Sequence, residues 1–597
     1  MLGPIAYREV ITLPRKGGHY VTRAVYLGVL WVLALTAWQA VVGWEQLATI
    51  GDNARFHIIL FQILVYAQLT LLLFFSALTS ANNITIEKDR RTFVLLLMTD
   101  LRNYEIVLGK LFGSMLQILI LLFGTLPIFA LLLFLGGITG QQVIQAFLIM
   151  AATTIAAGSL GTLVALWRDK TFQTLALTVL YLVLYLILVW GLSVLPELVG
   201  FISVDMVDNV QACLDPVSAL QSVLEPFSQS NSIIPAAYGY TVAMLGLSVL
   251  INFVSIWKLR KWNPKGEPIM QREKIADGPE VDRAKAHAAP GKLRNVWANP
   301  ILFREIMTRA YGNRPLIVKA AYFLVLGLIC YYALLPLFRG EYGNPWLAAQ
   351  GLVPVTILSM LLINAQAVTA ITTERDLRSL DLLLVTDLTA QEFIFGKLLG
   401  ILYNTKEFLL PPLILAIIYG VNGFMASPPE LGRNMESTAC VVVAMLVVFA
   451  FIMVFGVHVA LRNKSSRLAI ANALGTVFFL TCGTLVCIFL ILINGRFEYQ
   501  WASFIFFLAA GIGGLWWVLS ADRPSTALTL AAWLCPLGVF YTVTTVLIGK
   551  PGTRESADPI MPFLVIVGAF GFTLAAMMVP LLSEFDVAMG RTTSDAD

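Results

Sequence analysis

Long apolar runs recur along almost the whole chain, and they constrain its fold more than any other feature. Each run is about 20 residues long, the length that an α-helix needs to cross the hydrocarbon core of a membrane. The chain of 597 residues is 58% hydrophobic and only 13% charged, whereas soluble domains carry about 25% charged residues. The runs are continuously apolar rather than alternating, which excludes a transmembrane β-barrel. The sequence therefore predicts an all-α, polytopic transmembrane bundle.

The apolar runs predict fourteen spans. Six lie in the first half of the chain, at 23–44, 57–82, 106–135, 143–166, 172–195 and 233–257. Eight lie in the second half, at 316–337, 352–372, 394–420, 438–461, 468–493, 501–519, 526–548 and 560–582. The pair at 501–519 and 526–548 is compatible with two crossings or with one re-entrant hairpin, and either leaves the orientation of the other spans unchanged.

The basic residues indicate how the spans are oriented. With the N-terminus in the cytoplasm, 33 of the 40 Lys and Arg residues fall in cytoplasmic segments, 6 fall outside, and Lys406 lies within a span. Basic residues of short loops stay on the cytoplasmic side. We therefore expect a multi-pass protein of the inner (plasma) membrane with both termini in the cytoplasm.

One charged, Leu-rich passage occurs twice, each time directly after a long apolar run. The string "EKDRRTFVLLLMTDLRNYEIVLGK" at 87–110 and the string "ERDLRSLDLLLVTDLTAQEFIFGK" at 374–397 share 12 identities over 24 positions at an offset of 287. The predicted orientation places both copies in the cytoplasm.

A second repeated pair precedes the first span of each half. "GPIAYREVIT" at 3–12 aligns with "NPILFREIMT" at 299–308. Both halves begin and end on the same side, so we predict two parallel pseudo-repeats of about six spans each, unlike the inverted repeats of many secondary transporters. The polar stretch at 258–298 is rich in Pro, Gly and charge and reads as a cytoplasmic linker.

The charged passages predict short amphipathic helices at the membrane boundary. Glu87 and Arg91 are four residues apart, as are Glu374 and Arg378, so each pair meets on one helix face. "TAQE" at 389–392 fits a capping box, whereas the first copy has "RNYE" there. Gly109 and Gly396 permit close packing of the next span, and Lys110 and Lys397 are placed where a long side chain can snorkel to the interface.

The repeated passage resembles the signature between the second and third spans of ATP-binding-cassette (ABC) transporter permeases of the type-2 exporter family. The "REVIT" and "REIMT" segments resemble the amphipathic arm that precedes the first span in that family. Residues 214–230 and 534–545 resemble its outer-face helices between the fifth and sixth spans. The extra spans at 501–548 depart from the six-span plan of the family.

The resemblance implies two permease halves fused in one chain. The first half would comprise 1–257, with an arm at 3–19, a coupling helix at about 83–104 and an outer-face segment at 196–232. The second half would comprise 299–582, with an arm at 299–315, a coupling helix at about 370–391 and the extra spans, followed by a cytoplasmic tail at 583–597.

The resemblance also implies which residues meet the other components. The residues expected to dock an ATPase are Glu87, Arg91, Thr99, Asp100, Glu374, Arg378, Thr386 and Asp387, and the interfacial arm residues are Arg8, Glu9, Arg304 and Glu305. No P-loop of the form G-x-x-x-x-G-K-[ST] occurs in the sequence. We therefore expect two copies of a separate P-loop ATPase to bind ATP and Mg. The other expected partners are the lipid bilayer and an unidentified substrate, with no nucleic acid.

Two adjacent charges fall inside an apolar run of the second half. Lys406 and Glu407 lie about nine residues into their span, about 13 Å deep at 1.5 Å per residue. Ionisable residues within the membrane suggest a functional site. They could line a translocation path, hold a partner span or snorkel into polar crevices. Pro411 and Pro412 just beyond them predict a break or kink, and Pro127 predicts another in the first half.

Three other classes of function come into question. An ion-gradient-driven secondary transporter would need intramembrane carboxylates and broken helices in corresponding places, and only Lys406 and Glu407 point that way. A membrane enzyme would need clustered acid, base or metal-binding residues, and the sequence suggests no catalytic, cofactor-binding or metal site. A non-transporting scaffold is compatible with the same pattern.

Overall fold

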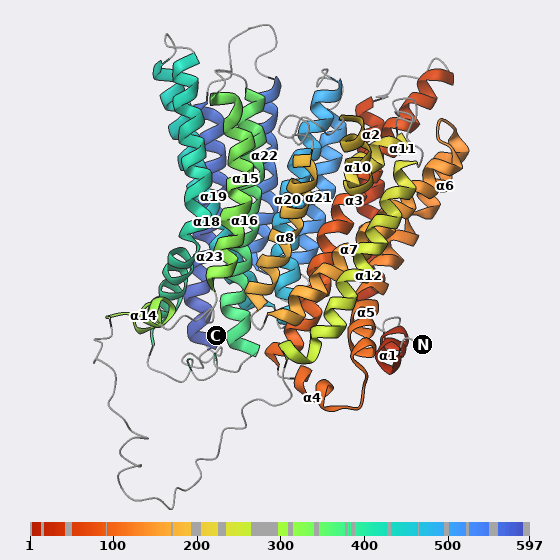
Figure 1. Ribbon diagram of the computed structural model, residues 1–597. Helices are drawn as coiled ribbons and strands as arrows, with labels where there is room; N and C mark the ends of the chain where they lie inside the picture. Colours follow the sequence, from red (N-terminus) through yellow and green to blue (C-terminus); the bar gives the residue numbers. More distant parts are fainter. Residues whose placement is uncertain are drawn as a thin grey trace, which may run out of the picture.

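The protein is a bundle of upright helices (Figure 1). The computed structural model describes residues 3–12, 17–41, 50–90, 92–168, 171–192, 204–224, 235–263, 297–307, 315–338, 345–376, 380, 383, 388–426, 431–463, 465–494, 501–520, 525–548 and 559–588. Among them, eleven helices are long and apolar enough to cross a membrane, and three shorter apolar helices occupy Tyr26–Trp38, Lys319–Leu335 and Phe504–Leu519. Over their described residues, the fourteen predicted spans coincide with helices, which confirms the all-α polytopic fold.

The first half begins with a short arm helix and ends with a long span. Its helices are α1 (Gly3–Thr12), α2 (Gly17–Val41), α3 (Ile50–Asp89), α4 (Thr92–Met98), α5 (Asn103–Gly124), α6 (Leu126–Leu135), α7 (Gly140–Trp167), α8 (Thr171–Gly191), α10 (Val204–Leu214), α11 (Pro216–Leu224) and α12 (Ala236–Trp262).

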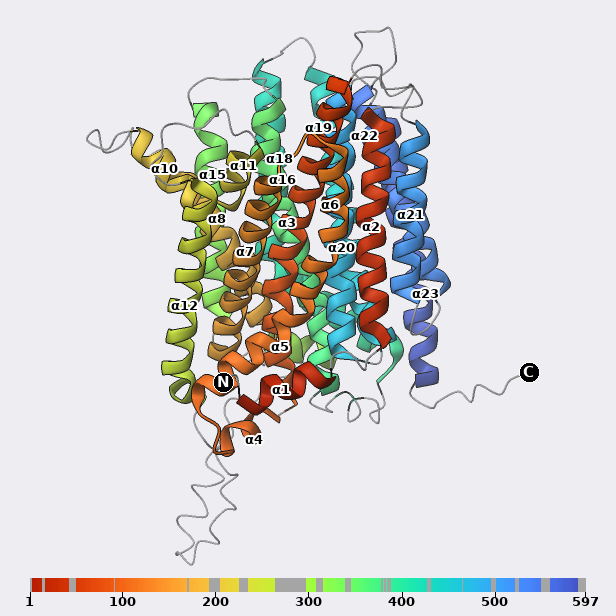
Figure 2. The same cartoon turned by 90° about the vertical axis from the view of Figure 1, so that its right-hand side faces the viewer.

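The second half follows the same order. Its helices are α14 (Pro300–Met307), α15 (Pro315–Phe338), α16 (Pro345–Asp376), α18 (Ala390–Ala426), α19 (Leu431–Arg462), α20 (Ser466–Asn494), α21 (Trp501–Ser520), α22 (Thr526–Ile548) and α23 (Ile560–Ala588). The two arms, α4 and the C-terminal end of α23 lie at one end of the bundle, which we call the arm end (Figures 1 and 2).

The two halves pack by one scheme. In the first half α7 lies between α3 and α12, and in the second half α19 lies between α16 and α23. The arm α1 packs on α5 as α14 packs on α18, and α8 packs on α3 as α20 packs on α16. Equivalent helices run in the same direction from the arm end, so the halves are parallel pseudo-repeats.

A glycine near the C-terminal end of α7 and another near that of α19 let two long helices of each half approach closely. A Cβ on Gly161 of α7 would lie 2.2 Å from the carbonyl oxygen of Ala77 on α3. A Cβ on Gly456 of α19 would lie 2.7 Å from the Cβ of Ala367 on α16. Small residues permit such contacts within membranes, where helices associate through close packing rather than through the hydrophobic effect.

The halves meet along aromatic contacts and at the arm end. Phe74 of α3 stacks on Phe478 of α20 with ring centroids 3.9 Å apart. Trp190 of α8 packs on Tyr332 of α15 with centroids 5.0 Å apart. Each contact joins a helix of one half to a helix of the other, which makes the two repeats one continuous bundle.

The prolines act differently in the two halves. Pro127 separates α5 from α6, as predicted, because α5 ends at Gly124 and α6 begins one residue before the proline. Of the break or kink predicted at Pro411 and Pro412, the break does not occur, because α18 continues through both. Pro412 cannot bond the carbonyl of Phe408, and the hydroxyl of Tyr322 donates to that oxygen at 3.5 Å instead.

The segment at 501–548 forms two long antiparallel helices. At 1.5 Å per residue, α21 and α22 measure about 30 and 35 Å, enough for two crossings of a hydrocarbon core of about 30 Å. The prediction that 534–545 is an outer-face helix is wrong, because these residues lie inside α22, whose apolar run is unbroken. The first half has the short helices α10 and α11 there, near the end opposite the arms (Figure 1).

Candidate functional site

The first charged passage forms a compact tip at the arm end. The predicted single helix at 83–104 is instead three pieces: the last turns of α3, the separate helix α4, and the start of α5. On α4, Phe93 and Leu97 are four residues apart and buried, whereas Leu95 and Met98 are 64% and 66% exposed. The helix therefore anchors one face on the bundle and presents the other outward, at the extreme of the molecule (Figures 1 and 2).

A turn follows α4 and ends at the first residue of α5. The hydroxyl of Thr99 donates to the carbonyl of Leu96 at 2.6 Å, and Thr99 and Asp100 are exposed. The backbone N–H of Arg102 donates to the side chain of Glu105 at 2.9 Å, which is half of a capping box. Arg91 lies outside the described residues. The exposed pair Thr99 and Asp100 thus extends the outward surface of α4.

The second charged passage is described at its two ends and at Leu380 and Leu383 between them. Arg378, Thr386 and Asp387 lie outside the described residues. The predicted capping box at 389–392 is confirmed: the N–H of Thr389 donates to Glu392 at 3.0 Å, and the N–H of Glu392 donates to the hydroxyl of Thr389 at 3.2 Å. The N-terminus of α18 is therefore firmly fixed.

Glu87 and Glu374, two carboxylates that we assigned to ATPase docking, lie in equivalent internal ion pairs. Glu87 at the end of α3 is paired with Lys110 of α5. Glu374 at the end of α16 lies 2.7 Å from Nζ of Lys397 on α18. Both lysines are buried, so the prediction that they snorkel to the interface is wrong. The pairs join the base of one span to the base of the next.

The arm of the second half joins this network. Glu305 on α14 lies 2.6 Å from Nζ of Lys397 and 3.4 Å from Arg304, and Arg304 is also paired with Glu374. The side chains of Lys397 and Glu305 are only 1% and 2% exposed. We call these four residues, Arg304, Glu305, Glu374 and Lys397, the arm cluster. Because two positive and two negative charges meet, the cluster is internally neutral.

The arms are also held by close backbone contact. A Cβ on Gly109 of α5 would lie 3.0 Å from Cβ of Ile5 on α1, and a Cβ on Gly396 of α18 would lie 2.9 Å from Cβ of Ile301 on α14. This confirms the close packing predicted for both glycines. Arg8 is exposed on α1, and the side chain of Glu9 lies outside the described part of the chain.

A third equivalent pair was missed by sequence reasoning. Nζ of Lys88 donates to the carbonyls of Leu166 and Arg168 at 2.8 and 3.0 Å, at the end of α7. At the aligned position, Arg375 donates to the carbonyls of Ala460 and Asn463 at 2.9 and 2.5 Å, at the end of α19. Cations stabilise helix C-termini. The constant offset of 287 that aligns Lys88 with Arg375 was the available signal.

One ion pair crosses between the halves at the arm end. Nε of Arg90, just after α3, lies 3.6 Å from Oδ1 of Asp376, the last residue of α16. Arg90 is half exposed, so the pair contributes little stability on its own. The pair shows that the arm-end bases of the two halves are in contact, at the ends of α3 and α16.

Lys406 and Glu407 point in different directions from α18. Oε1 of Glu407 lies 2.5 Å from Nζ of Lys319 on α15, so this carboxylate holds a partner span. Nζ of Lys406 lies 4.1 Å from the centroid of the Tyr403 ring on its own helix. The two charges do not neutralise each other.

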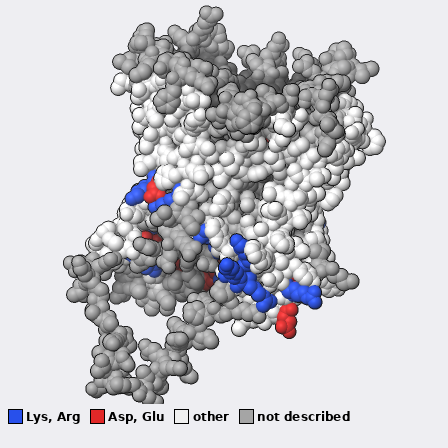
Figure 3. Space-filling model, in the orientation of Figure 1, with Lys and Arg blue, Asp and Glu red and all other residues white. Residues whose placement is uncertain are grey.

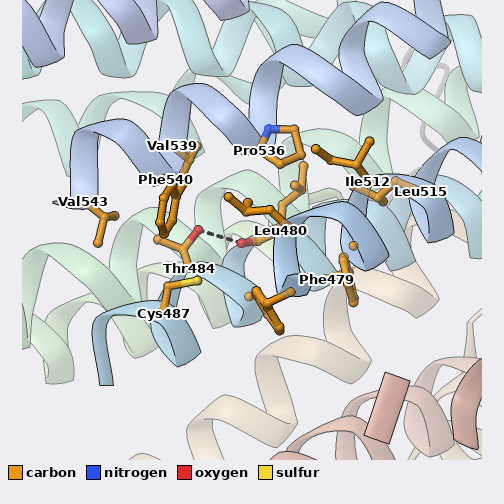
Figure 4. A pocket seen from close by; sticks show the side chains of 14 residues that line it. Phe479, Leu480, Thr484, Cys487, Ile512, Leu515, Pro536, Val539, Phe540 and Val543 are labelled. Atoms are coloured by element: carbon orange, nitrogen blue, oxygen red, sulfur yellow. Dashed lines mark hydrogen bonds between the residues drawn. The ribbon is translucent and has the colours of Figure 1, made fainter. Parts of the chain in front are cut away.

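An apolar cavity of about 50 Å³ lies among α20, α21 and α22 (Figure 4). Its wall is made of aromatic and aliphatic side chains with Thr484 and Cys487, and the hydroxyl of Thr484 already donates to the carbonyl of Leu480 at 2.7 Å. The cavity therefore offers space to small apolar groups and no charged partner to a polar one.

These features together define a class: a membrane-embedded helical protein of two parallel halves, each with an arm and a structured passage at the same end. A family model described as ABC-2 family transporter protein matches residues 251–582, more than half of the chain. The chain belongs to this family of ABC transporter permeases. Neither the curated proteins nor the solved structures gave a match.

Proposed function

We propose that this chain is the membrane-spanning subunit of an ABC exporter in which two copies of a separate P-loop ATPase supply the energy. The arm end would face the cytoplasm of the inner membrane, and ATP and Mg would be bound by the partner. The observation that carries the proposal is the position of α4 at the arm end, with one face buried and the other exposed. This helix is an outward, partly apolar tip that is mechanically continuous with the spans.

The continuity runs through named contacts. A partner that displaces α4 also displaces the end of α3, because only two residues separate the helices. Glu87 and Lys110 connect that end to α5, and Lys88 connects it to the end of α7. A push on the tip would therefore reach three spans of the first half at once.

The mechanism follows from the repeat. Two ATPase copies that close on each other would move the two charged passages together, and each half would rock as a rigid body about their shared interface. The substrate would pass between the halves. The carboxylates Glu87 and Glu374 would then transmit force within each half, whereas Leu95, Met98, Thr99 and Asp100 would provide the docking surface of the first half.

The docking surface predicts a charge-sensitive partner interaction. Met98→Asp places a charge on the exposed apolar face of α4, where a docked partner would have to bury it. We therefore expect the amount of ATPase that co-purifies with the tagged chain from native membranes to fall about tenfold, which corresponds to about 1.4 kcal/mol. Quantitative mass spectrometry of the purified complex measures the ratio of the two proteins.

The matched control is Met206→Asp on α10, near the opposite end, where the methionine is 64% exposed. It should leave the ATPase bound. If no P-loop ATPase accompanies the unmodified chain and fresh membranes show no associated ATP hydrolysis, the proposed function is wrong. Equal retention by both variants would instead remove α4 as the docking site.

A further inference from the structure

An unpartnered face runs along α18 on the flank of the bundle. Its exposed apolar residues recur at helical spacing, at Phe395, Leu399, Leu402, Leu410, Ile414, Ile417 and Val421. Lys406 lies in the middle of this stripe, between Leu402 and Leu410, and is itself exposed. Figure 3 shows few Lys, Arg, Asp or Glu side chains on this flank above the arm end. A basic side chain on this stripe therefore lies where lipid contacts the protein.

The level of Lys406 in the membrane follows from its neighbours. Residues 408–426 of α18 and 320–338 of α15 contain no Asp, Glu, Lys or Arg. Each segment is 19 residues, about 28 Å at 1.5 Å per residue, which matches a hydrocarbon core of about 30 Å. The Lys319–Glu407 pair places the starts of these segments at one height. On this argument the two charges lie close to the arm-side boundary of the hydrocarbon core.

The charges at this boundary leave one cation in excess. Glu407 neutralises Lys319 at 2.5 Å. Within the described residues, the one contact found for the ammonium of Lys406 is the Tyr403 ring, and no carboxylate lies within ion-pair distance. Tyr403 is itself exposed. The aligned positions in the first half are Leu119 and Ile120, so the arrangement occurs once in the chain.

We propose that Lys406, with Tyr403 beside it, binds the headgroup phosphate of an anionic phospholipid in the arm-side leaflet. The acyl chains of that lipid would lie along Leu410 and the rest of the stripe. Charge complementarity identifies the headgroup, and the exposed apolar residues that continue into the core identify a lipid rather than a free anion. The site does not depend on ATPase docking.

The test uses the full purified chain in nanodiscs of phosphatidylcholine with increasing phosphatidylglycerol of the same acyl chains. Bound phosphatidylglycerol is counted by native mass spectrometry after mild release. We expect the unmodified chain to retain this lipid preferentially, and Lys406→Ala to bind it about fivefold more weakly, since one basic residue near an anionic surface contributes about 1 kcal/mol. Lys406→Arg should keep the preference.

The alternative outcomes are distinct. Lys406 is exposed, so Lys406→Ala should melt at the wild-type temperature in pure phosphatidylcholine, which separates lost binding from lost folding. If Lys406→Ala retains phosphatidylglycerol as well as the unmodified chain does, the proposal is overturned. It is equally overturned if inorganic phosphate displaces the lipid at equal concentration, because the site would then recognise a free anion.

Discussion

Replacing Lys397 with methionine is expected to lower the free energy of unfolding by about 3–5 kcal/mol, because removal of one partner leaves a buried charge uncompensated. Lys397 contacts both Glu305 and Glu374, and the side chain of Glu305 is 2% exposed. Methionine fills a similar volume but offers no donor. The melting temperature of the detergent-purified chain and its accumulation in the membrane measure the loss.

The equivalent residue of the first half supplies the matched control. Lys110 pairs with Glu87, whose side chain is 29% exposed and therefore keeps access to water when the lysine is lost. Lys110→Met should cost clearly less than Lys397→Met. Glu305→Leu combined with Lys397→Met should recover part of the stability, because the carboxylate is removed with its partner. Equal losses from the two lysine variants would contradict a buried arm cluster.

Gly161→Leu is expected to separate α7 from α3 and to cost about 3 kcal/mol or more, at the upper end of overpacking effects. The Cβ would meet the carbonyl oxygen of Ala77, and a backbone atom cannot rotate out of the way as a side chain can. Fluorescence-detected size-exclusion chromatography of the solubilised chain should show aggregation or loss of the monodisperse peak.

A second glycine distinguishes crowding from a general effect of leucine. Gly246 lies on α12, and apart from the neighbouring backbone of α12 itself, no atom would lie within 4 Å of a Cβ there. Gly246→Leu should give an unchanged elution profile, and Gly456→Leu should behave like Gly161→Leu. A normal profile for Gly161→Leu would mean that α3 and α7 are not in close contact.

The spans could be predicted from sequence because apolar length is a local property. The spans predicted at 57–82 and 143–166 lie within α3 and α7, and predicting them required no knowledge of the helices that pack against them. The repeat was equally accessible, since the aligned strings carry the same charged residues at the same offset. The spans and the repeat can therefore both be found from the linear sequence alone.

The contacts between distant residues could not be predicted in this way. Glu374 reaches Lys397 on the next helix and Arg304 on the arm, and helical spacing predicts neither contact; Arg378, its expected partner, lies outside the described residues. The partner of Glu407 could not be predicted either, because Lys319 lies on another helix, α15. The continuation of α18 through its prolines could not be predicted either, because the hydroxyl that donates to the carbonyl of Phe408 belongs to Tyr322 on another helix.

If the proposed function holds, ATP hydrolysis in a partner moves the bases of the two halves relative to each other. The most direct measurement is cross-linking between Arg90→Cys and Asp376→Cys, which replace the ion pair that joins those bases. The six native cysteines are first replaced, and a protease site is placed within 264–296 so that cleavage separates the halves unless they are cross-linked.

In native membranes that contain the ATPase, we expect a short bifunctional maleimide to join the halves efficiently without nucleotide. The yield should change several-fold when the ATPase is trapped with ATP, because the halves rock as rigid bodies. The same change should be absent when the cross-linking chain also carries Met98→Asp. A yield that is identical with ATP, with ADP and without nucleotide would contradict the account.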